Sequence, residues 1–315
     1  MIDKHGREIN YLRLSLTENC NLRCLYCNPH GCTSPQKVSM DTEEVISLVK
    51  GAAKLGVRKL RFTGGEPLLR KDIVEIIEKT SKIDGIDDIG LTTNALLLEA
   101  LAPSLKKAGL KRINISLDTL MEDRYLEMTG GMIQKVFKGI EAAYRENFDY
   151  IKINTVLIKG FNEDEIVKFC ELTREKEIHV RFIELMPMGD STSWSSKHYL
   201  SSKRVLELCP KLKLVEREYS SSPSLLYSYP DGAGRVGIIN PLSDKFCSSC
   251  NRIRITSQGK LKLCLHSEGE IDLLTALRNG ESVERIIEEA LTSKPPEHKL
   301  EEGEYISKNM VKIGG

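Results

Sequence analysis

The sequence has no surplus of charge of either sign and no long apolar run, and it contains a single tryptophan. Its 315 residues contain 46 Lys and Arg against 45 Asp and Glu, which gives a net charge of +1. A nearly neutral chain has no general attraction for nucleic acid or an acidic membrane surface, although a local basic pocket is still compatible with it. The N-terminus is polar, and no run reaches the roughly 18 apolar residues of a membrane span. We therefore expect a cytoplasmic protein without a nucleic-acid or membrane partner.

The sequence contains nine cysteines, a number that needs an explanation in a chain of this kind. Six form two tight groups, a first triad of Cys20, Cys24 and Cys27 and a second triad of Cys247, Cys250 and Cys264. In a protein without a secretion signal, closely spaced cysteines bind metal or carry out redox chemistry more often than they form disulfides. Cys170 and Cys209 are isolated, and we expect them to be small buried side chains.

Strand-like and helix-like segments alternate up to about residue 186. Strands are predicted over 11–16, 59–63, 88–93, 111–117, 150–157 and 178–185. The spacing of apolar side chains predicts helices between them, over 41–56, 71–82, 95–108, 133–146 and 163–176. Six βα units in a row favour a parallel sheet. Because no Gly-rich dinucleotide fingerprint follows the first strand, we expect an α/β fold with a partial (β/α)6 barrel rather than a doubly wound sheet.

The remainder of the chain has a different pattern. Residues 187–235 are rich in Ser and interrupted by Pro, and we interpret them as loops with a short helix over 202–208 and a strand over 212–217. A β-hairpin is predicted over 252–257 and 260–265, followed by helices over 271–278 and 281–291. We expect two domains, a partial barrel over 1–190 and a C-terminal extension over 191–315 that closes its open side.

Each predicted barrel strand has one apolar and one polar side, because alternate residues of a strand point to opposite faces. In a barrel wrapped by helices the apolar side meets the helices, which leaves Arg13, Arg61 and Lys152 for the lumen. A solvated sheet face is the alternative, but crossover helices would cover the outer face. Ordinary barrels fill the lumen with aliphatic side chains. Several cations in one cavity favour a polyanionic ligand such as a phosphate ester.

Both triads have the composition of a metal site. The first follows the first predicted strand and so lies at the barrel mouth that carries active sites in such folds. Three thiolates can hold three corners of a four-iron cube and leave one iron open. The second triad encloses the predicted hairpin, which returns Cys264 to the neighbourhood of Cys250. Zinc is the alternative at both places, completed by His30 or Cys32 at the first triad and by His266 at the second.

The first triad and its aromatic neighbour Tyr26 resemble the signature of the radical S-adenosylmethionine (SAM) superfamily. Gly64-Gly65-Glu66-Pro67, at the end of the second predicted strand, looks like the second motif of that superfamily, whose backbone contacts the amino group of SAM. The resemblance implies a [4Fe-4S] cluster on the first triad. It also implies a set of SAM contacts, namely Tyr26, Gly65, Ser116 and Met186.

The residues around the second triad narrow the resemblance. Phe246 to Arg254, Leu263-Cys264-Leu265 and the terminal Gly314-Gly315 resemble the GTP 3′,8-cyclase family (molybdenum cofactor biosynthesis protein A), and the likeness covers nearly the whole chain. It implies a lyase with a second [4Fe-4S] cluster on the second triad, whose open iron faces the guanine of GTP. It further implies a set of GTP contacts, namely Arg13, Arg61, Thr92, Lys152, Arg252 and Arg254. Gly314 and Gly315 would lie in the barrel mouth.

The same resemblance implies the reaction. SAM is split into methionine and a 5′-deoxyadenosyl radical, which takes a hydrogen from the ribose of GTP, and the ribose carbon then attacks C8 of the guanine. The product is (8S)-3′,8-cyclo-7,8-dihydroguanosine 5′-triphosphate, in the first step of molybdenum cofactor biosynthesis. No acid–base catalytic residue is assigned. An electron donor protein and the downstream cyclic pyranopterin monophosphate synthase are the implied partners, and a homodimer is left open.

The sequence departs from the family pattern in three places. Asn28 stands where Met is usual, Glu18-Asn19 stands where Asp-Arg is common, and the segment 187–235 is short. Two other functions are compatible with the triads. A radical SAM enzyme that modifies a peptide should lack the Arg252-x-Arg254 pair and the terminal glycines, both of which are present. A non-catalytic zinc-binding protein is the other alternative.

Overall fold

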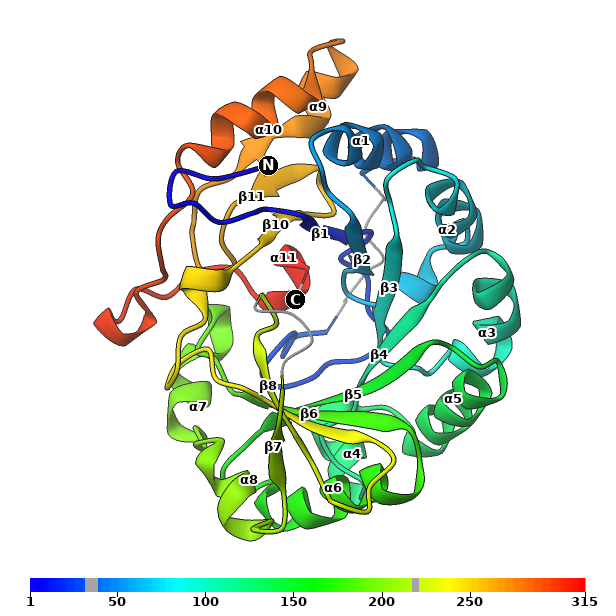
Figure 1. Cartoon of the computed structure of the whole chain (residues 1–315), viewed down its shortest axis with the longest axis vertical. Helices are drawn as coiled ribbons and strands as arrows, with labels where there is room; N and C mark the ends of the chain where they lie inside the picture. Colours follow the sequence, from blue (N-terminus) through cyan, green and yellow to red (C-terminus); the bar gives the residue numbers. More distant parts are fainter. Residues whose placement is uncertain (32–38, 217–220, 315) are drawn as a thin grey trace.

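The computed structural model describes residues 1–31, 39–216 and 221–314. Within these ranges the strands form one twelve-stranded sheet in the order β12-β11-β10-β1-β2-β3-β4-β5-β6-β9-β8-β7. Six parallel strands at its centre confirm the predicted barrel strands: β1 (Tyr11–Ser15), β2 (Lys59–Thr63), β3 (Asp88–Thr93), β4 (Arg112–Ser116), β5 (Tyr150–Leu157) and β6 (Ile178–Glu184). The sheet curls around a central space with helices on its outside (Figure 1).

Helices cover the outer face of these strands: α1 (Thr42–Lys54), α2 (Ile73–Ser81), α3 (Leu98–Lys107), α4 (Glu122–Thr129), α5 (Ile133–Arg145) and α6 (Ile166–Glu175). Five of them confirm the predicted helices within a few residues at each end, whereas α4 was not predicted. Asp41 caps the start of α1: its side chain accepts from the Glu44 N–H while the Glu44 side chain accepts from the Asp41 N–H. This reciprocal cap satisfies two backbone donors that would otherwise have no partner.

The apolar sides of the strands meet the helices, as the alternation predicts. Leu12, Leu14, Ile113 and Ile115 have no exposed surface and belong to one continuous core with the inner faces of the helices. Their polar neighbours therefore point to the opposite side of the sheet, into the lumen.

The C-terminal extension adds strands to both edges of the six-stranded barrel. At one edge, β9 (Arg235–Ile239) pairs in parallel with β6, and β8 (Ser224–Ser228) and β7 (Lys213–Val215) extend the sheet beyond it by antiparallel pairing. At the other edge, β10 (Arg252–Ile255) pairs in parallel with β1, and β11 (Lys260–Lys262) and β12 (Ile271–Asp272) extend the sheet by antiparallel pairing. The predicted hairpin is confirmed as β10 and β11. The division into domains at residue 190 stays a prediction.

The extension also contains five helices within the described residues: α7 (Thr192–Lys197), α8 (Lys203–Leu208), α9 (Leu273–Arg278), α10 (Val283–Leu291) and α11 (Met310–Ile313). The interpretation of 187–235 as mostly loops was wrong for α7, β8 and the start of β9. Helix α11, near the end of the described chain, lies inside the ring of strands (Figure 1). No helix of the described chain is both long enough and apolar enough to span a bilayer.

Candidate active site

The first triad lies on the loop that follows β1. The backbone N–H of Arg23 donates to the Thr129 carbonyl at the end of α4 at 2.9 Å, which fixes one side of the loop. The N–H of Cys27 donates to the Cys24 carbonyl at 3.0 Å and closes a tight turn. The unpredicted helix α4 thus supports the cysteine loop.

The three thiols of this triad lie close enough to influence one another. Burial raises the pKa of Cys24 well above its ordinary value, and the neighbouring Cys27 and Asp118 raise it further. Burial, followed by the Cys20 thiol, raises the pKa of Cys27 to about 12. The Cys24 and Cys27 thiols are therefore protonated in the metal-free protein, and iron has to displace those protons.

Two glycines bring the end of β2 against the cysteine loop. A Cβ at Gly64, where φ is +145°, would lie 2.5 Å from the Thr17 carbonyl oxygen, and one at Gly65 would lie 2.3 Å from the Asn19 carbonyl oxygen. The Gly65 N–H donates to the Thr17 carbonyl at 2.7 Å. Only glycine allows two backbone segments to approach this closely.

Glu66 fastens the same turn to β3. Its carboxylate accepts from the Thr93 hydroxyl at 2.8 Å, the Asn94 N–H at 2.7 Å and the Leu68 N–H at 3.0 Å. Burial raises its pKa to about 7, although these hydrogen bonds lower it. The turn that carries Gly65 is therefore rigidly joined to two strands.

The predicted SAM contacts come from separate elements. Tyr26 lies within the first triad, and its hydroxyl donates to the Asp118 carboxylate at 2.7 Å. Asp118 stands two residues beyond Ser116, the last residue of β4. Met186 follows β6 and packs in an apolar cluster with Ile313 of α11. The structure thus joins Tyr26 to the end of β4 through Asp118, a residue that the sequence analysis did not single out.

Cationic side chains lie side by side across three neighbouring strands. The register places Arg13 of β1 between Arg254 of β10 and Arg61 of β2. Arg252 stands opposite Tyr11 at the preceding position of the same face. Arg61 is 7% exposed, and its Nε donates to the Tyr11 hydroxyl at 2.6 Å. Four of the six predicted GTP contacts therefore form one basic wall.

Burial and mutual repulsion both act on this wall. Burial lowers the pKa of Arg13 well below its ordinary value, and Arg254 lowers it further. Burial and then Arg252 lower the pKa of Arg254 to about 10. Burial would raise the pKa of Tyr11, but Arg61 and Arg13 outweigh it and lower that pKa to about 8. A polyanion in the lumen would relieve this repulsion.

The opposite wall is polar and carries the other two predicted GTP contacts. The register aligns Thr92 of β3, Asn114 of β4 and Lys152 of β5. Asn154, two residues further along β5, is aligned with Arg181 of β6. Among the described residues, Thr92 Oγ1, Asn114 Oδ1 and Asn154 Oδ1 are buried without a hydrogen-bond partner. Buried acceptors of this kind are normally satisfied, so they point to a ligand or water in the lumen.

The second triad gathers where the predicted hairpin folds back. The N–H of Cys250 donates to the Cys247 carbonyl at 3.1 Å, and the pairing of β10 with β11 returns the chain to Cys264. Burial raises the pKa of Cys247, and Cys264 and Cys250 add to the effect. Burial would also raise the pKa of Cys250, but the Arg252 and Lys294 cations outweigh it, and the net shift is downward.

Helix α11 and the residue that follows it occupy the space between the two triads. The Val311 N–H hydrogen-bonds the Cys27 thiol, and Ile313 packs in the apolar cluster that also contains Leu265, the neighbour of Cys264. The Gly314 carbonyl accepts from Arg254 Nη1 at 2.9 Å. The last described residue thus lies beside the basic residues of the barrel strands. Gly315 lies outside the described residues.

The chain matches two family models, the radical SAM superfamily over residues 14–173 and Molybdenum Cofactor Synthesis C over residues 178–300. It is 50% identical to a GTP 3′,8-cyclase of Peptoclostridium acidaminophilum over 320 residues, which covers 100% of this chain and 98% of that protein. It is 51% identical to a GTP 3′,8-cyclase of Clostridium botulinum strain Hall over 320 residues, with both chains covered completely. The chain belongs to the GTP 3′,8-cyclase family.

Solved structures agree on the fold. The crystal structure of SuiB from Streptococcus suis bound to S-adenosylmethionine superimposes with a TM-score of 0.66 at 15% sequence identity, over 98% of this chain and 79% of that one. Likeness at this identity shows the radical SAM fold alone. Membership of the cyclase family comes from the full-length relatives and disfavours both alternatives, a peptide-modifying enzyme and a zinc-binding scaffold.

The two triads suit the pair of [4Fe-4S] clusters that GTP 3′,8-cyclases use together with SAM. Each offers three thiols, the ligands that iron–sulfur clusters take, on loops whose thiols interact electrostatically. Among the described residues, no three His, Cys, Asp or Glu side chains converge as the ligands of a single ion would. In a cube each thiolate binds a different iron, so the thiols need not converge on one point.

The residues of the zinc alternatives have other surroundings. The His30 side chain is 76% exposed and lies 3.6 Å from the Asp190 carboxylate, and Cys32 lies outside the described residues. His266 packs edge-on against His298, with ring centroids 4.9 Å apart. Cys170 and Cys209 are 0% and 3% exposed, which confirms that they are buried.

Glu18, one of the departures from the family pattern, is directed at the extension. Its carboxylate accepts from the Ser257 hydroxyl at 3.1 Å and from the Gln258 side chain at 3.0 Å, in the turn between β10 and β11. The Glu18 side chain thus ties the cysteine loop to a turn of the extension. The contact of Asn19 with Gly65 is made by the backbone carbonyl, which any residue at this position would supply.

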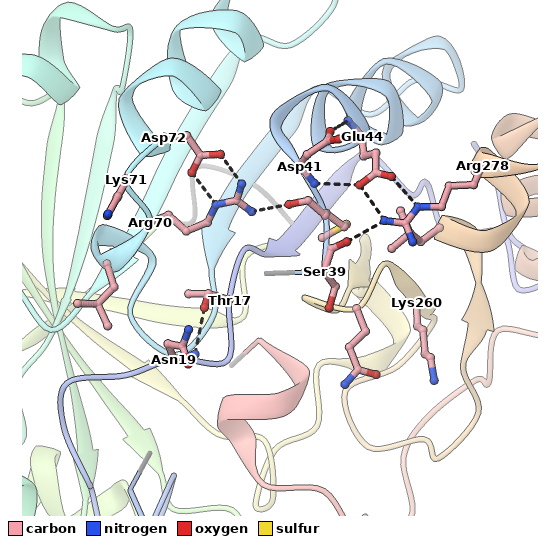
Figure 2. A pocket seen from close by; sticks show the side chains of 14 residues that line it. Thr17, Asn19, Ser39, Asp41, Glu44, Arg70, Lys71, Asp72, Lys260 and Arg278 are labelled. Carbon is pink, nitrogen blue, oxygen red and sulfur yellow. Dashed lines mark hydrogen bonds and ion pairs between the residues drawn. The ribbon is translucent and has the colours of Figure 1, made fainter. Parts of the chain in front are cut away.

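A cavity of about 970 Å³ lies apart from the predicted site, between α1, the end of β2 and the extension (Figure 2). None of the predicted site residues lines it. Two of its cations pair with carboxylates of the same lining: Arg70 Nε donates to Asp72 at 2.8 Å, and Arg278 Nε to Glu44 at 2.7 Å. With Asp41, Lys71 and Lys260 the lining has four basic and three acidic side chains, so its net charge of +1 gives little attraction for a charged ligand.

Proposed function

We propose that this chain converts GTP to (8S)-3′,8-cyclo-7,8-dihydroguanosine 5′-triphosphate, the first step of molybdenum cofactor biosynthesis. The observation that carries the proposal is the basic wall of Arg254, Arg13 and Arg61 on three adjacent strands. A neutral protein concentrates these cations in one lumen, beside two cysteine triads. The negative charge of a nucleoside triphosphate would neutralise the positive charge of this wall.

The two triads would hold the clusters, Cys20, Cys24 and Cys27 at the first and Cys247, Cys250 and Cys264 at the second. When bound, the first cluster supplies the electron for reductive cleavage of SAM, and the second offers an open iron to the guanine. Tyr26, Gly65, Ser116 and Met186 are proposed to hold SAM.

The remaining roles belong to side chains of the lumen. Arg13, Arg61, Arg252 and Arg254 are proposed to bind the triphosphate through charge-assisted hydrogen bonds. Thr92 and Lys152 would contact the nucleotide from the opposite wall. The surrounding barrel would keep water away from reactive carbon, and Gly314, whose carbonyl accepts from Arg254, is proposed to help enclose the site.

We also propose the partners that this chemistry needs. A one-electron donor protein has to reduce the first cluster, and cyclic pyranopterin monophosphate synthase consumes the product. These steps fit a cytoplasmic enzyme, and a homodimer is proposed as its state in solution.

The experiment is anaerobic incubation of the iron-loaded protein with a chemical reductant, SAM and GTP, followed by mass spectrometry. GTP deuterated at the ribose C3′ should transfer deuterium to 5′-deoxyadenosine, and a new isomer with the formula of GTP should appear. Omission of SAM is the control. Cleavage of SAM without deuterium transfer and without the isomer would contradict GTP as the substrate.

A further inference from the structure

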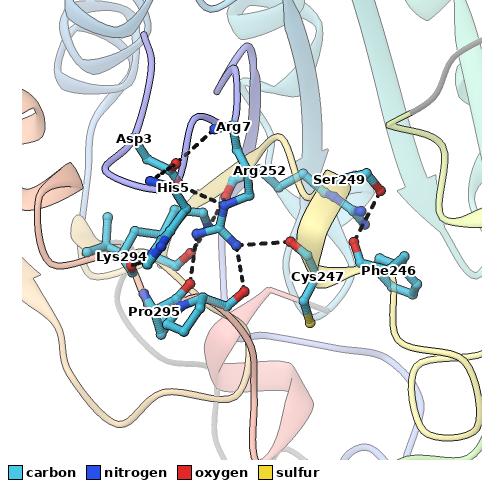
Figure 3. A network of polar contacts seen from close by, with 11 residues as sticks. Asp3, His5, Arg7, Phe246, Cys247, Ser249, Arg252, Lys294 and Pro295 are labelled. Atoms are coloured by element: carbon cyan, nitrogen blue, oxygen red, sulfur yellow. Dashed lines mark hydrogen bonds and ion pairs between the residues drawn. The ribbon is translucent and has the colours of Figure 1, made fainter.

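Two buried cations, Arg7 and Lys294, contact the backbone at or near the cysteines of the second triad, and Figure 3 shows both on the side of Cys247. Arg7 is 6% exposed, and its Nη1 donates to the Cys247 carbonyl at 2.9 Å. Lys294 is 2% exposed, and its Nζ donates to the carbonyls of Arg252, at 2.9 Å, and Leu263. Arg252 stands two residues after Cys250, and Leu263 directly precedes Cys264.

Arg7 is itself held rigidly. Its Nε donates to the Asp3 carboxylate at 2.6 Å, and both side chains are almost completely buried. Its remaining donors reach the carbonyls of Pro295 at 2.7 Å and Pro296 at 2.8 Å. One guanidinium therefore joins the N-terminal segment, the segment after α10 and the first cysteine of the triad.

A second contact links the two cations. His5 Nε2 lies 3.1 Å from the Lys294 carbonyl, and the His5 N–H donates to the same Asp3 carboxylate that binds Arg7. Lys294 also lies within electrostatic range of Cys250 and Cys264. Asp3 balances the charge of Arg7, whereas the groups that Lys294 contacts through its Nζ are neutral carbonyls.

We propose that Arg7 and Lys294 are positioning residues for the second cluster. Arg7 fixes the backbone at Cys247, and Lys294 fixes it beside Cys250 and Cys264, so together they set the spacing of the three thiolates. The buried Lys294 ammonium also offsets the negative charge that three thiolates bring to this site. Outer contacts of this kind commonly orient the ligands of a metal group and tune it. The inference rests on the proposed placement of a cluster at the second triad.

The test isolates the second cluster in the full-length chain. Replacing Cys20, Cys24 and Cys27 by Ser gives a parent protein whose only expected cluster is the second. Lys294→Met and Arg7→Met are then made in this parent. Each should lose iron to a chelator about tenfold faster or more, and Lys294→Met should lower the reduction potential of the cluster. Lys294→Arg keeps the charge and should restore the potential.

Arg70→Met is the matched control. Arg70 is 5% exposed and donates to the carbonyls of Leu16, at 3.2 Å, and Met40, at 3.1 Å, but to none in the second triad. It should lower the thermal stability of the protein while leaving iron retention and the potential of the second cluster unchanged.

The possible results separate two failures. A parent that binds no iron would refute the placement of the cluster, and with it this part of the proposed function. In the other case the parent binds iron, and Lys294→Met and Arg7→Met match it in iron retention, reduction potential and electron paramagnetic resonance spectrum. That result would refute the positioning role alone. If Lys294→Met does not fold, Arg7→Lys tests the positioning role instead. This variant keeps the positive charge but loses the guanidinium group that donates to the carbonyls of Cys247 and both prolines. Unaltered iron retention in that variant overturns the role of Arg7.

Discussion

Replacing Gly314 by Ala should undock the end of the chain from the lumen. A Cβ at this position would lie 2.7 Å from the Ser15 Cβ and 3.2 Å from the Thr63 Cγ2, and φ is +70°. The left-handed backbone costs a non-glycine residue about 1–2 kcal/mol, and crowding in a packed interior typically costs about 1–3 kcal/mol. The docked state should therefore lose about 2–5 kcal/mol.

The lower figure already corresponds to about a 30-fold fall in the ratio of docked to undocked chain ends. Gly314→Ala should therefore reduce cyclisation of GTP, by up to about 30-fold at this lower figure, because the Arg254 contact is weakened. Iron content and SAM binding should be unchanged. Product is measured by mass spectrometry on fully iron-loaded protein, and docking by resistance of the C-terminal residues to carboxypeptidase. Deletion of Gly314 and Gly315 should abolish cyclisation in the same way.

Gly303→Ala is the matched control. Gly303 also has a left-handed backbone, with φ +80°, but nothing lies within 4 Å of its missing Cβ. The Gly303→Ala variant should lose a little stability, because a non-glycine residue adopts the left-handed backbone at a cost, but it should keep its activity. Cyclisation at the parent rate by iron-loaded Gly314→Ala, or by the deletion variant, would refute the reasoning and leave the end of the chain without a role in the site.

Three further results are expected. Cys24→Ser and Cys250→Ser should each remove about half of the iron and sulfide per chain, since each removes a ligand of a different cluster; unchanged iron in either would contradict the ligand assignment. Arg252→Ala and Arg254→Ala should each weaken GTP binding by about 10–150-fold, the equivalent of roughly 1.5–3 kcal/mol per charge-assisted contact, while SAM cleavage persists; parent-like GTP affinity would remove the phosphate role. Burial raises the pKa of Glu66 from 4.5 to about 7. The free energy of unfolding of the iron-free protein should therefore fall as the pH rises from about 4.5 to 7, and chemical denaturation should show a smaller fall for Glu66→Gln. The same fall in both proteins would exclude Glu66 as the cause of the pH dependence.

Local patterns predicted the parts of the fold that depend on local spacing. The period-2 alternation in β1, β2 and β5 put Arg13, Arg61 and Lys152 in the lumen, and the register confirms that the first two are neighbours. The spacing of each cysteine triad likewise survives folding, because each lies on one loop or one hairpin. Arg181 could have been found by the same alternation, since His179 and Arg181 alternate with Val180 and Phe182 in β6.

Other features had no local signal. Helix α4 buries few side chains, Tyr125, Met128 and Thr129, so its apolar stripe is too narrow to stand out. Strands β8 and β9 are interrupted by Ser and Gly and owe their pairing to the edge of β6. The contact between Arg7 and Cys247 joins residues 240 positions apart. No periodicity within a segment can reveal such a pair.

The two-sided attachment of the extension has a consequence for truncation. Strand β10 covers the edge of β1 through four aligned pairs, and β9 covers the edge of β6 through five. A chain cut at residue 190 would expose both edges at once, with their amide and carbonyl groups free to recruit strands from other molecules. Such a fragment should aggregate rather than fold alone. The radical SAM half and the molybdenum cofactor half are therefore better regarded as one folding unit than as modules that could be exchanged between enzymes.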